Sequence, residues 1–283
     1  MEIRDLKIFL SVAQHGGISK AAGDLNYVQS NVTARIKHLE ELLNAPLFHR
    51  KTKGVELTAS GHLLLDYAKR IVLLAHEAEN VIKDQGEPRG KLSIGTMETT
   101  AAVRLPTLLA TYHRTYPKVE LNLLTGPSEA SLKRLLEYDV DGALVAGDVN
   151  QDLFIVDKAF EEELVLVAPY NLKSIDQLAN LTILVFRAGC SYRAQLERWL
   201  RESGRLTYKI IEFGSIEGIL GCVAAGMGVS FLPRSVVNEK KKQNYYSLHS
   251  IPEEFGCMTT WFVRRRNENP SKALQTFREM VLA

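Results

Sequence analysis

The sequence predicts an α + α/β protein with a small helical domain at its N-terminus, one long helix, and a larger α/β region. Three patterns support this prediction. Apolar residues recur at helical spacing over residues 2–43. A spacing of three and four then continues from Leu64 to Val81, which is typical of a long helix. From Lys91 onward, short β-branched or leucine-rich runs alternate with amphipathic segments, which favours α/β layers.

Composition limits the class of protein. The 283 residues are 46% hydrophobic, which allows two or three domains with real cores. The net charge is only +2, so any nucleic-acid surface must come from local placement of charge. Three widely spaced cysteines without a CxxC pair argue against disulfides or a zinc site and favour a reducing compartment. No signal peptide or membrane-length apolar run is visible, so a cytoplasmic protein is expected.

The first three helices are expected to form a compact head. Residues 2–15 form an amphipathic helix, and residues 18–25 form a short second helix that Ser19 can cap. Asn26-Tyr27 break the helical period, and a third helix starts near Gln29. The third helix carries an apolar stripe at steps of four, three and four: Val32, Ile36, Leu39 and Leu43.

The other face of this third helix is polar. Its side chains are Gln29, Ser30, Asn31, Thr33, Arg35, Lys37 and His38. Amides, hydroxyls and cations near the start of a helix are the groups that reach base edges and phosphates in the major groove of DNA. Residues 18–43 therefore favour a DNA-binding helix-turn-helix. An ordinary helical hairpin with a polar surface is the alternative that this segment alone leaves open.

A short β-hairpin is expected to follow, over residues 45–57. Its tip is cationic, and Arg50, Lys51 and Lys53 can each neutralise a backbone phosphate without selecting a sequence. A charge run is more often a solvated face, but its position directly after the polar helix favours phosphate binding. The hairpin then corresponds to the wing of a winged helix-turn-helix.

A long helix is expected from Thr58 to about Gln85. Its apolar positions alternate by three and four, in an a/d seam of Leu64, Tyr67, Ile71, Leu74, Ala78 and Val81. No partner helix lies nearby in the chain, so the simplest partner is a second copy, and we predict a dimerisation helix. Packing on its own domain is the alternative. Residues 86–90, rich in glycine and proline, form a linker.

The remainder alternates strands with helices. Expected strands lie at 92–97, 119–124, 142–147, 163–169, 181–186, 209–213, 229–233 and 258–266, and helices lie near 101–115 and 128–138, from 191, near 216–225, and from 271. This order implies parallel sheets in two α/β subdomains. No GxGxxG, P-loop, HExxH or GxSxG motif occurs, and the seven histidines lack ligand spacing. We therefore expect no catalytic site, no cofactor and no metal.

The order of these parts, and two blocks of residues, closely resemble the LysR-type transcriptional regulators of bacteria over essentially the full chain. The first block comprises Phe9, Ala21-Ala22, Leu25, Gln29-Ser30, Val32-Thr33, Ile36, Leu39-Glu40, Leu43, Pro46-Leu47-Phe48, Arg50, Leu57-Thr58 and Gly61. The second block is residues 226–233, GMGVSFLP.

The resemblance implies three domains. These are a winged helix-turn-helix DNA-binding domain (1–58), a linker or dimerisation helix (59–86), and an effector-binding domain (91–283) similar to periplasmic binding proteins. The effector domain is expected to divide into subdomain I (91–161 and 267–283) and subdomain II (162–266), joined by crossover strands. The resemblance also implies self-association into dimers or tetramers, and RNA polymerase is a further candidate partner.

The resemblance further implies a sequence-specific regulator that binds double-stranded DNA at an imperfect inverted repeat. The expected base-reading residues are Gln29, Ser30, Asn31, Thr33 and Arg35, and the expected phosphate-binding residues are Arg50, Lys51 and Lys53. Two positions depart from the family pattern. Val28 stands where most members have serine, and Ala34 stands where arginine is frequent. The choice between activation and repression does not follow from these residues.

A small-molecule effector is expected between the two subdomains. The matching positions are Glu98, Thr99, Thr100, Ser128, Ser191, Tyr192 and Arg193. Several of them lie at expected helix N-termini, where free N–H groups favour an anion, and Arg193 can pair a carboxylate. We therefore predict a small organic anion. Glu98 opposes an anion, and we expect it to bind an amino group or to pair with Arg193 in the empty site. Plain N-capping by the Thr and Ser residues is the alternative.

Other functions remain open at this point. Cys190 lies beside the expected cleft, so a redox-sensing regulator is one alternative, although a buried thiol is the commoner case. Residues 91–283 alone would suit a solute-binding protein, but the cationic head and the missing signal peptide argue against it. An α/β enzyme would need a nucleophile–base pair or a cofactor motif, and neither is visible.

Overall fold

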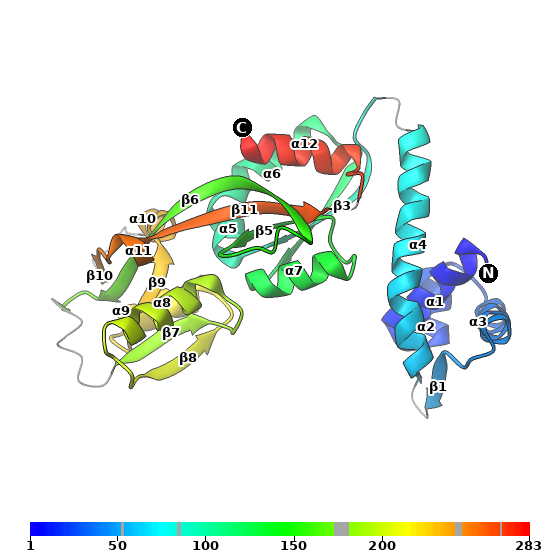
Figure 1. Ribbon diagram of the computed structural model, residues 1–283, viewed down its shortest axis with the longest axis horizontal. Coiled ribbons are helices and arrows are strands. Elements are labelled where there is room, and N and C mark those ends of the chain that lie inside the picture. The colour runs from blue at the N-terminus through cyan, green and yellow to red at the C-terminus, as the bar shows by residue number, and fades with distance from the viewer. Residues whose placement is uncertain (52–53, 84–85, 173–180, 241–244, 267) are drawn as a thin grey trace. The chain divides into compact units, whose positions relative to one another are not determined.

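The computed structural model describes residues 1–51, 54–83, 86–172, 181–240, 245–266 and 268–283. The chain divides into two compact units, residues 1–85 and 86–283, which are described separately. The smaller unit contains α1 (Ile3–His15), α2 (Ile18–Asp24), α3 (Gln29–Leu43), β1 (Phe48–Lys51), β2 (Gly54–Leu57) and α4 (Ala59–Lys83). We call it the head. It has the predicted order of three helices, a hairpin and a long helix (Figure 1).

The core of the head joins the inner faces of its helices. Phe9 from α1 and Val32 and Leu39 from α3 are fully buried, and Leu47 is buried with them at the start of the hairpin. These are the positions that the 3.6-residue period places on one face of each helix. Val32, Ile36 and Leu39 of the apolar stripe predicted for α3 therefore pack inward, whereas Leu43, its fourth member, is 40% exposed.

Tight turns set the helix-turn-helix geometry. Asn26 adopts a φ of 54° between α2 and α3, a left-handed conformation that asparagine tolerates better than most residues. Gly17 occupies the N-cap of α2, and Ser19 lies inside the helix. The predicted cap at Ser19 is therefore wrong. Without a side-chain acceptor, glycine is accepted at an N-cap nearly as well as threonine.

The hairpin is fixed to the helices at both of its ends. The N–H of Val55 donates to Gly16 O at the end of α1 (2.9 Å), and Glu40 Oε1 accepts from Leu47 N–H (2.8 Å). Thr58 donates to Pro46 O (2.6 Å) and accepts from Gly61 N–H (2.9 Å), so it joins the hairpin to the first turn of α4. These bonds fix where the hairpin emerges relative to α3.

The long helix α4 has two apolar faces rather than one seam. Leu64, Leu65 and Ile71 pack against the core of the head. Leu63, Tyr67 and Leu74, at 69%, 61% and 66% exposure, form a stripe that is open to solvent. The predicted seam is therefore divided, because Leu64 and Ile71 pack against the core of the head while Tyr67, Leu74 and Ala78 are exposed. The side chain of Val81 lies outside the described residues.

The larger unit contains two lobes. The first lobe holds β3 (Gly90–Thr96), α5 (Glu98–Val103), α6 (Leu105–Thr115), β4 (Val119–Thr125), α7 (Ser128–Leu136), β5 (Gly142–Ala146) and α12 (Lys272–Leu282). The second holds β7 (Thr182–Phe186), α8 (Ser191–Glu202), β8 (Lys209–Phe213), α9 (Ile216–Ala224), β9 (Ser230–Pro233), α10 (Arg234–Lys240), β10 (Tyr246–His249) and α11 (Glu253–Gly256).

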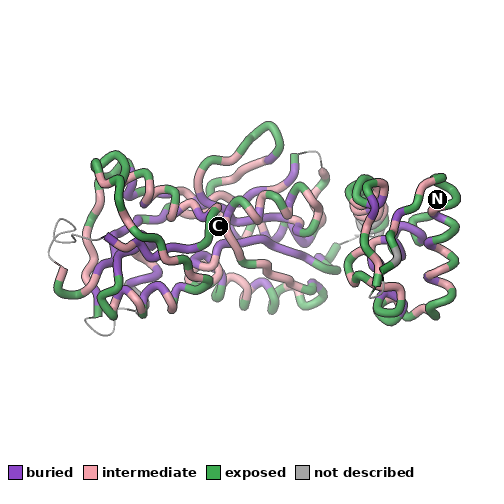
Figure 2. Tube along the Cα trace, turned by 90° about the horizontal axis from the view of Figure 1, so that it is seen from below, coloured by how far each residue is buried: buried purple, intermediate pink, exposed green. Residues whose placement is uncertain are grey.

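Two long antiparallel strands, β6 (Phe154–Pro169) and β11 (Cys257–Arg265), connect the lobes (Figure 1). Residues 154–163 of β6 pair with β11, whose other edge pairs with β5 of the first lobe. Residues 164–169 of β6 pair with β9 and β10 of the second lobe. Buried residues lie along the second half of β6 and along much of β11, and Figure 2 shows buried stretches in the interior of the larger unit.

Parallel pairing holds for only part of each lobe. Strand β3 pairs in parallel with β4 and β5, and β7 pairs in parallel with β8, as the alternation of strands and helices predicts. Every described pair that involves β6 is antiparallel. The expected strand at 163–169 is therefore only the second half of β6. Its first half, residues 154–163, crosses between the lobes paired with β11 and is less buried than the second half.

Candidate functional site

The first candidate site is the outer face of α3. Val28 is the N-cap residue of this helix, and Gln29 and Ser30 follow it with exposed side chains. Thr33 is half-buried, and its hydroxyl donates to Gln29 O (2.9 Å). Further along the same face, the exposed residues are Ala34, Lys37 and His38. The N-terminal half of α3 thus presents an amide, hydroxyls and small apolar groups.

Two of the predicted base-reading residues, Asn31 and Arg35, are half-buried, and Arg35 pairs with carboxylates at the start of α1. Nη1 of Arg35 lies 3.2 Å from Glu2 Oε2 and 3.1 Å from Asp5 Oδ1, and Asp5 is 1% exposed. Asn31 is half-buried, and its Oδ1 has no hydrogen-bond partner within the described ranges. Sequence periodicity placed both on the polar face. The structure brings Gln29, Ser30 and Thr33 together on the outside and does not bring Arg35 with them.

The hairpin supplies the second part of this surface. Residues 48–51 of β1 pair with residues 57–54 of β2. Lys51 is exposed, and its Nζ lies 2.5 Å from Glu56 Oε2 on the partner strand. The side chain of Arg50 and the whole of Lys53 lie outside the described residues. Of the three predicted phosphate-binding cations, Lys51 alone is placed, next to a carboxylate that lowers the local positive charge.

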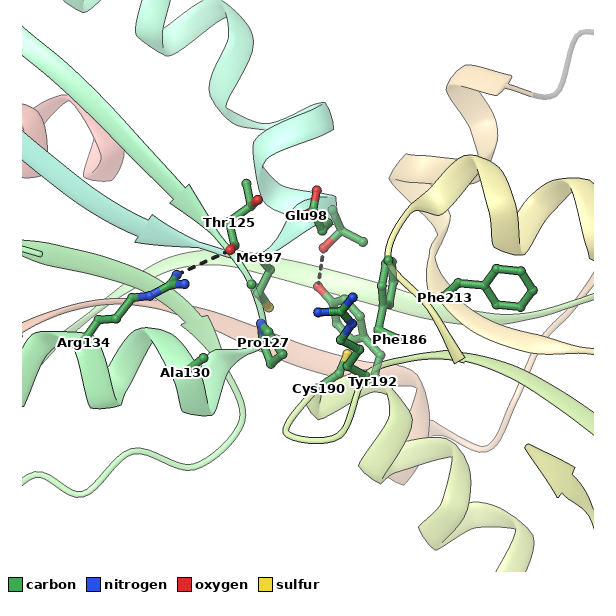
Figure 3. Close-up of a pocket in the computed structure, with 14 residues that line it drawn as sticks. Met97, Glu98, Thr125, Pro127, Ala130, Arg134, Phe186, Cys190, Tyr192 and Phe213 are labelled. Atoms are coloured by element: carbon green, nitrogen blue, oxygen red, sulfur yellow. Dashed lines mark hydrogen bonds between the residues drawn. The ribbon is translucent and has the colours of Figure 1, made fainter. Parts of the chain in front are cut away.

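The second candidate site is a cleft of about 360 Å³ between the two lobes. First-lobe residues lining it are Met97, Glu98, Thr99, Thr125, Gly126, Pro127, Ala130 and Arg134, and second-lobe residues are Phe186, Arg187, Cys190, Tyr192, Phe213 and Gly214 (Figure 3). Most of them lie directly after strands β3, β4, β7 and β8. Ligands of open α/β sheets bind at such carboxyl ends of strands.

Hydrogen bonds between hydroxyl and carbonyl groups join the lobes beside the cleft. Thr99 Oγ1 donates to Tyr192 Oη (3.3 Å), and both residues are buried. Ser191 Oγ donates to Ala146 O (2.5 Å), and it lies 3.3 Å from Ser128 Oγ. Burial raises the pKa of the Tyr192 hydroxyl, so this group stays protonated over the whole physiological range.

Six of the seven predicted effector residues therefore fall into two groups. Glu98, Thr99 and Tyr192 line the cleft. Thr100 and Ser128 are buried, and Ser191 is half-buried in the contact between the lobes. Helices α5 and α8 have no side-chain cap hydrogen bond, so the alternative role of plain N-capping is not what the structure shows.

Arg193 is not among the described residues that line the cleft. Its Nε lies 2.8 Å from Glu197 Oε1, and its Nη1 lies 2.5 Å from Glu212 Oε1. These two carboxylates occupy the guanidinium, and the expected pairing of Arg193 with Glu98 is wrong. Residue spacing did not reveal this, because Glu212 comes from a strand that is distant in sequence.

Two arginines that sequence reasoning missed face the cleft instead. Arg134 from α7 donates weakly to Thr125 O (3.4 Å), and Arg187 follows β7 with an exposed side chain. A signal was present in the sequence, since Arg187 comes immediately after the apolar strand at 181–186. The charged residues among the described lining of the cleft are Arg134, Arg187 and Glu98, and their net charge is +1.

Cys190 lines the same cleft and is buried there. The residue is 8% exposed, and burial raises the pKa of its thiol. A protonated thiol is a poor nucleophile, which disfavours redox sensing at this position. In the part of the chain that the structure covers, no cluster of three His, Cys, Asp or Glu side chains suits a metal ion. No described helix is long and apolar enough to cross a membrane.

A winged helix-turn-helix head and a two-lobed α/β unit with a cleft define a DNA-binding regulator that carries its own ligand-binding domain. Family comparisons agree. Residues 3–62 match the model of bacterial regulatory helix-turn-helix proteins of the lysR family, and residues 85–283 match the LysR substrate binding domain. The chain belongs to the LysR family of DNA-binding transcriptional regulators. The predicted fold class and function are confirmed, and the family consists of regulators rather than enzymes.

Relatives and solved structures cover nearly the whole chain. The HTH-type transcriptional regulator SoxR of Arthrobacter sp. (strain TE1826) is 43% identical over 281 residues, 99% of this chain and 96% of that protein. GltR of Bacillus subtilis (strain 168) is 43% identical over 280 residues, 98% of this chain and 95% of its own.

Two solved structures show the same fold at low identity. A full-length, single-substitution variant of OxyR from Pseudomonas aeruginosa superposes with a TM-score of 0.78 at 20% identity, covering 99% of this chain and 94% of that one. Full-length CbnR complexed with its target DNA gives a TM-score of 0.69 at 24% identity, covering 99% of both chains.

Proposed function

We propose that this regulator binds an imperfect inverted repeat as a dimer or a dimer of dimers, and that a small organic anion in the interlobe cleft modulates this binding. The positive charge of the cleft is the observation that favours an anionic effector. Arg134 and Arg187 face the space from opposite lobes, and Glu98 is the one carboxylate among the described lining residues. An anion that contacts both arginines would join the lobes, so its binding would favour the closed arrangement.

The size and polarity of the cleft narrow the effector further. About 360 Å³ suits a metabolite rather than a peptide. Met97, Pro127, Phe186 and Phe213 supply apolar walls. Glu98 is half-buried at the edge and would accept a hydrogen bond from an ammonium or hydroxyl group. We therefore propose a carboxylate with a short apolar body and a hydrogen-bond donor near Glu98.

Calorimetric titration of the full chain with a panel of small carboxylates, amino acids and sulfate tests the effector class. Arg187→Gln and Arg134→Gln should each weaken binding of the active compound about ten-fold or more, because a hydrogen bond to a charged group contributes about 1.5–3 kcal/mol. Arg193→Gln is the matched control, since its guanidinium is held by Glu197 and Glu212. Equal binding by all four proteins would contradict the proposed cleft.

On the DNA side, we propose that Gln29, Ser30 and Thr33 contact bases and that Arg50, Lys51 and Lys53 contact phosphate. The proposed base contacts are supported by the exposed N-terminal half of α3, which is the part of a recognition helix that meets base edges. Gel-shift titration on the DNA flanking its own gene tests this. Gln29→Ala should lower affinity about five-fold or more, as expected for a bidentate base contact. Unchanged affinity would remove α3 from the interface.

The open stripe on α4 supports the dimer. Leu63, Tyr67 and Leu74 expose apolar area at spacings of four and seven, which suits a second helix lying lengthwise against it. A two-fold pair of heads then presents two copies of α3 to successive major grooves, and this symmetry implies the inverted repeat. Contact with RNA polymerase remains part of the same proposal.

A further inference from the structure

Val28 breaks two local rules at one position. It is the N-cap residue of α3, with φ −76° and ψ 143°, and the helix has no side-chain cap hydrogen bond. Valine is among the poorest N-cap residues, because it offers no acceptor to the free N–H groups of the first turn. The same side chain is 69% exposed, although it is wholly apolar. A serine here would cap the helix and suit the solvent.

A position that violates local preferences without visible compensation is expected at a functional site. Single exposed apolar residues are common on protein surfaces, so exposure alone would carry little weight. The place of Val28 is what distinguishes it. It directly precedes Gln29 and Ser30, whose side chains are also exposed. These residues begin α3, the helix that is proposed to enter the major groove.

We infer that Val28 determines operator specificity by packing against the C5-methyl group of a thymine in each half-site. Thymine is the one standard base that presents a methyl group in the major groove, and apolar side chains recognise it by contact. Burial of the exposed valine against that methyl would remove apolar surface of both groups from water. The inference rests on the proposed placement of α3 in the groove.

The lack of a cap fits this role. A serine or aspartate at the N-cap turns its side chain toward the first-turn N–H groups of its own helix. Valine has no such bond to make, and its side chain is left free for the groove. Its β-branched shape also restricts χ1, so little rotamer freedom is lost on contact. The contact would thus add specificity at one base pair without adding charge.

Uridine scanning provides a direct test. Duplexes are first selected by the full-length wild-type chain from a random-sequence pool, and each thymine of the selected site is then replaced by deoxyuridine, which removes only the methyl group. Fluorescence anisotropy gives the dissociation constant of wild type, Val28→Ala and Leu42→Ala on every duplex. Leu42 is the control, because it is a 51% exposed apolar residue at the other end of α3.

The expected result is one thymine per half-site at which uridine weakens wild-type binding about four-fold, the effect of losing one buried methyl group. At that position Val28→Ala should bind thymine and uridine duplexes almost equally, so the two losses are not additive. Leu42→Ala should keep the full uridine effect. Circular dichroism of each variant confirms folding.

Binding of Gln29→Ala to the same duplexes distinguishes failure of the Val28 methyl contact from failure of the proposed placement of α3 in the major groove. If Gln29→Ala weakens binding but no thymine shows coupling to Val28, the methyl contact is wrong and the placement of α3 stands. If Gln29→Ala also has no effect, the placement of α3 itself fails. Uridine effects that persist in Val28→Ala at every position would assign the methyl contacts to other residues and overturn the inference.

Discussion

Arg35 and Asp5 form an ion pair that fastens α3 to α1. Nη1 of Arg35 lies 3.1 Å from Oδ1 of Asp5, a carboxylate with only 1% of its side chain exposed. Asp5 also accepts from the N–H of Glu2 (3.1 Å) through its other oxygen, so both oxygens are used. An arginine that periodicity places on the outer face therefore fixes the angle at which that face is presented.

Arg35→Ala should act on stability more than on base recognition. Loss of the guanidinium leaves the buried Asp5 carboxylate without its cation, and we expect the free energy of unfolding to fall by about 1–3 kcal/mol. Lys37→Ala is the control, because Lys37 is exposed and its pair with Glu41 (3.5 Å) is a surface contact. Urea titration measures both. An Arg35→Ala protein as stable as wild type would return Arg35 to the candidates for DNA contact.

Val28→Ser should make the head more stable and weaken its binding to the operator. A serine can accept from a first-turn N–H of α3, which no side chain does now, and should raise the free energy of unfolding of the head by about 0.5–1 kcal/mol. Operator affinity should fall in the same protein. Chemical denaturation and anisotropy titration measure the two effects, and a serine variant that is less stable than wild type would contradict the cap argument.

Sequence periodicity predicted the helices of the head because burial follows from the 3.6-residue repeat. It placed Val32, Ile36 and Leu39 inside, where the structure has them. It could not place Arg35 or Asn31, since residues at the margin of a face turn inward or outward according to tertiary neighbours such as Asp5. The pairing of Arg193 with Glu212 could not be predicted for the same reason, since it depends on how β8 packs beside α8. Alternation of strands with helices predicted β7 and β8 but not that Glu212 would lie beside α8.

Tyr192 should make the larger unit sensitive to alkali. Burial holds the pKa of its hydroxyl above the value of about 10 found in unfolded chains. Above that pH the unfolded chain releases a proton that the folded chain keeps, so stability is complete below pH about 10 and falls as the pH rises further. Tyr192→Phe should flatten this fall, whereas Tyr170→Phe, at an exposed ring, should not. Guanidinium unfolding from pH 8 to 11 measures the slopes.

A charged substitution on the open stripe of α4 should dissociate the proposed dimer. Tyr67→Glu places a charge among Leu63 and Leu74, and a dimer held by this stripe should dissociate at micromolar concentration. Leu42→Glu makes the same kind of change on an exposed leucine of α3 and should leave the assembly intact. Sedimentation velocity distinguishes them. A Tyr67→Glu protein that keeps the mass of wild type would show that another surface forms the dimer.

The three thiols should react in the order of their exposure. Cys257 is exposed and Cys222 is half-buried, while burial raises the pKa of Cys190 and reduces its thiolate fraction. Iodoacetamide at pH 8 followed by peptide mass spectrometry should therefore label Cys257 first and Cys190 last. Bound effector should slow Cys190 further, because this residue lines the cleft. Preferential labelling of Cys190 would restore the redox alternative.

The packing of α12 has a consequence for synthesis of the protein. Phe277 of this helix is fully buried in the first lobe, and Tyr112 Oη donates to Ala273 O (2.7 Å). Strand β11, which comes just before it in the chain, lies between β5 and β6. The first lobe therefore cannot close on the ribosome until residues 257–282 have emerged. Residues 1–85 form a compact unit with a core of their own, so we expect the head to fold first, before the two lobes of the larger unit are complete.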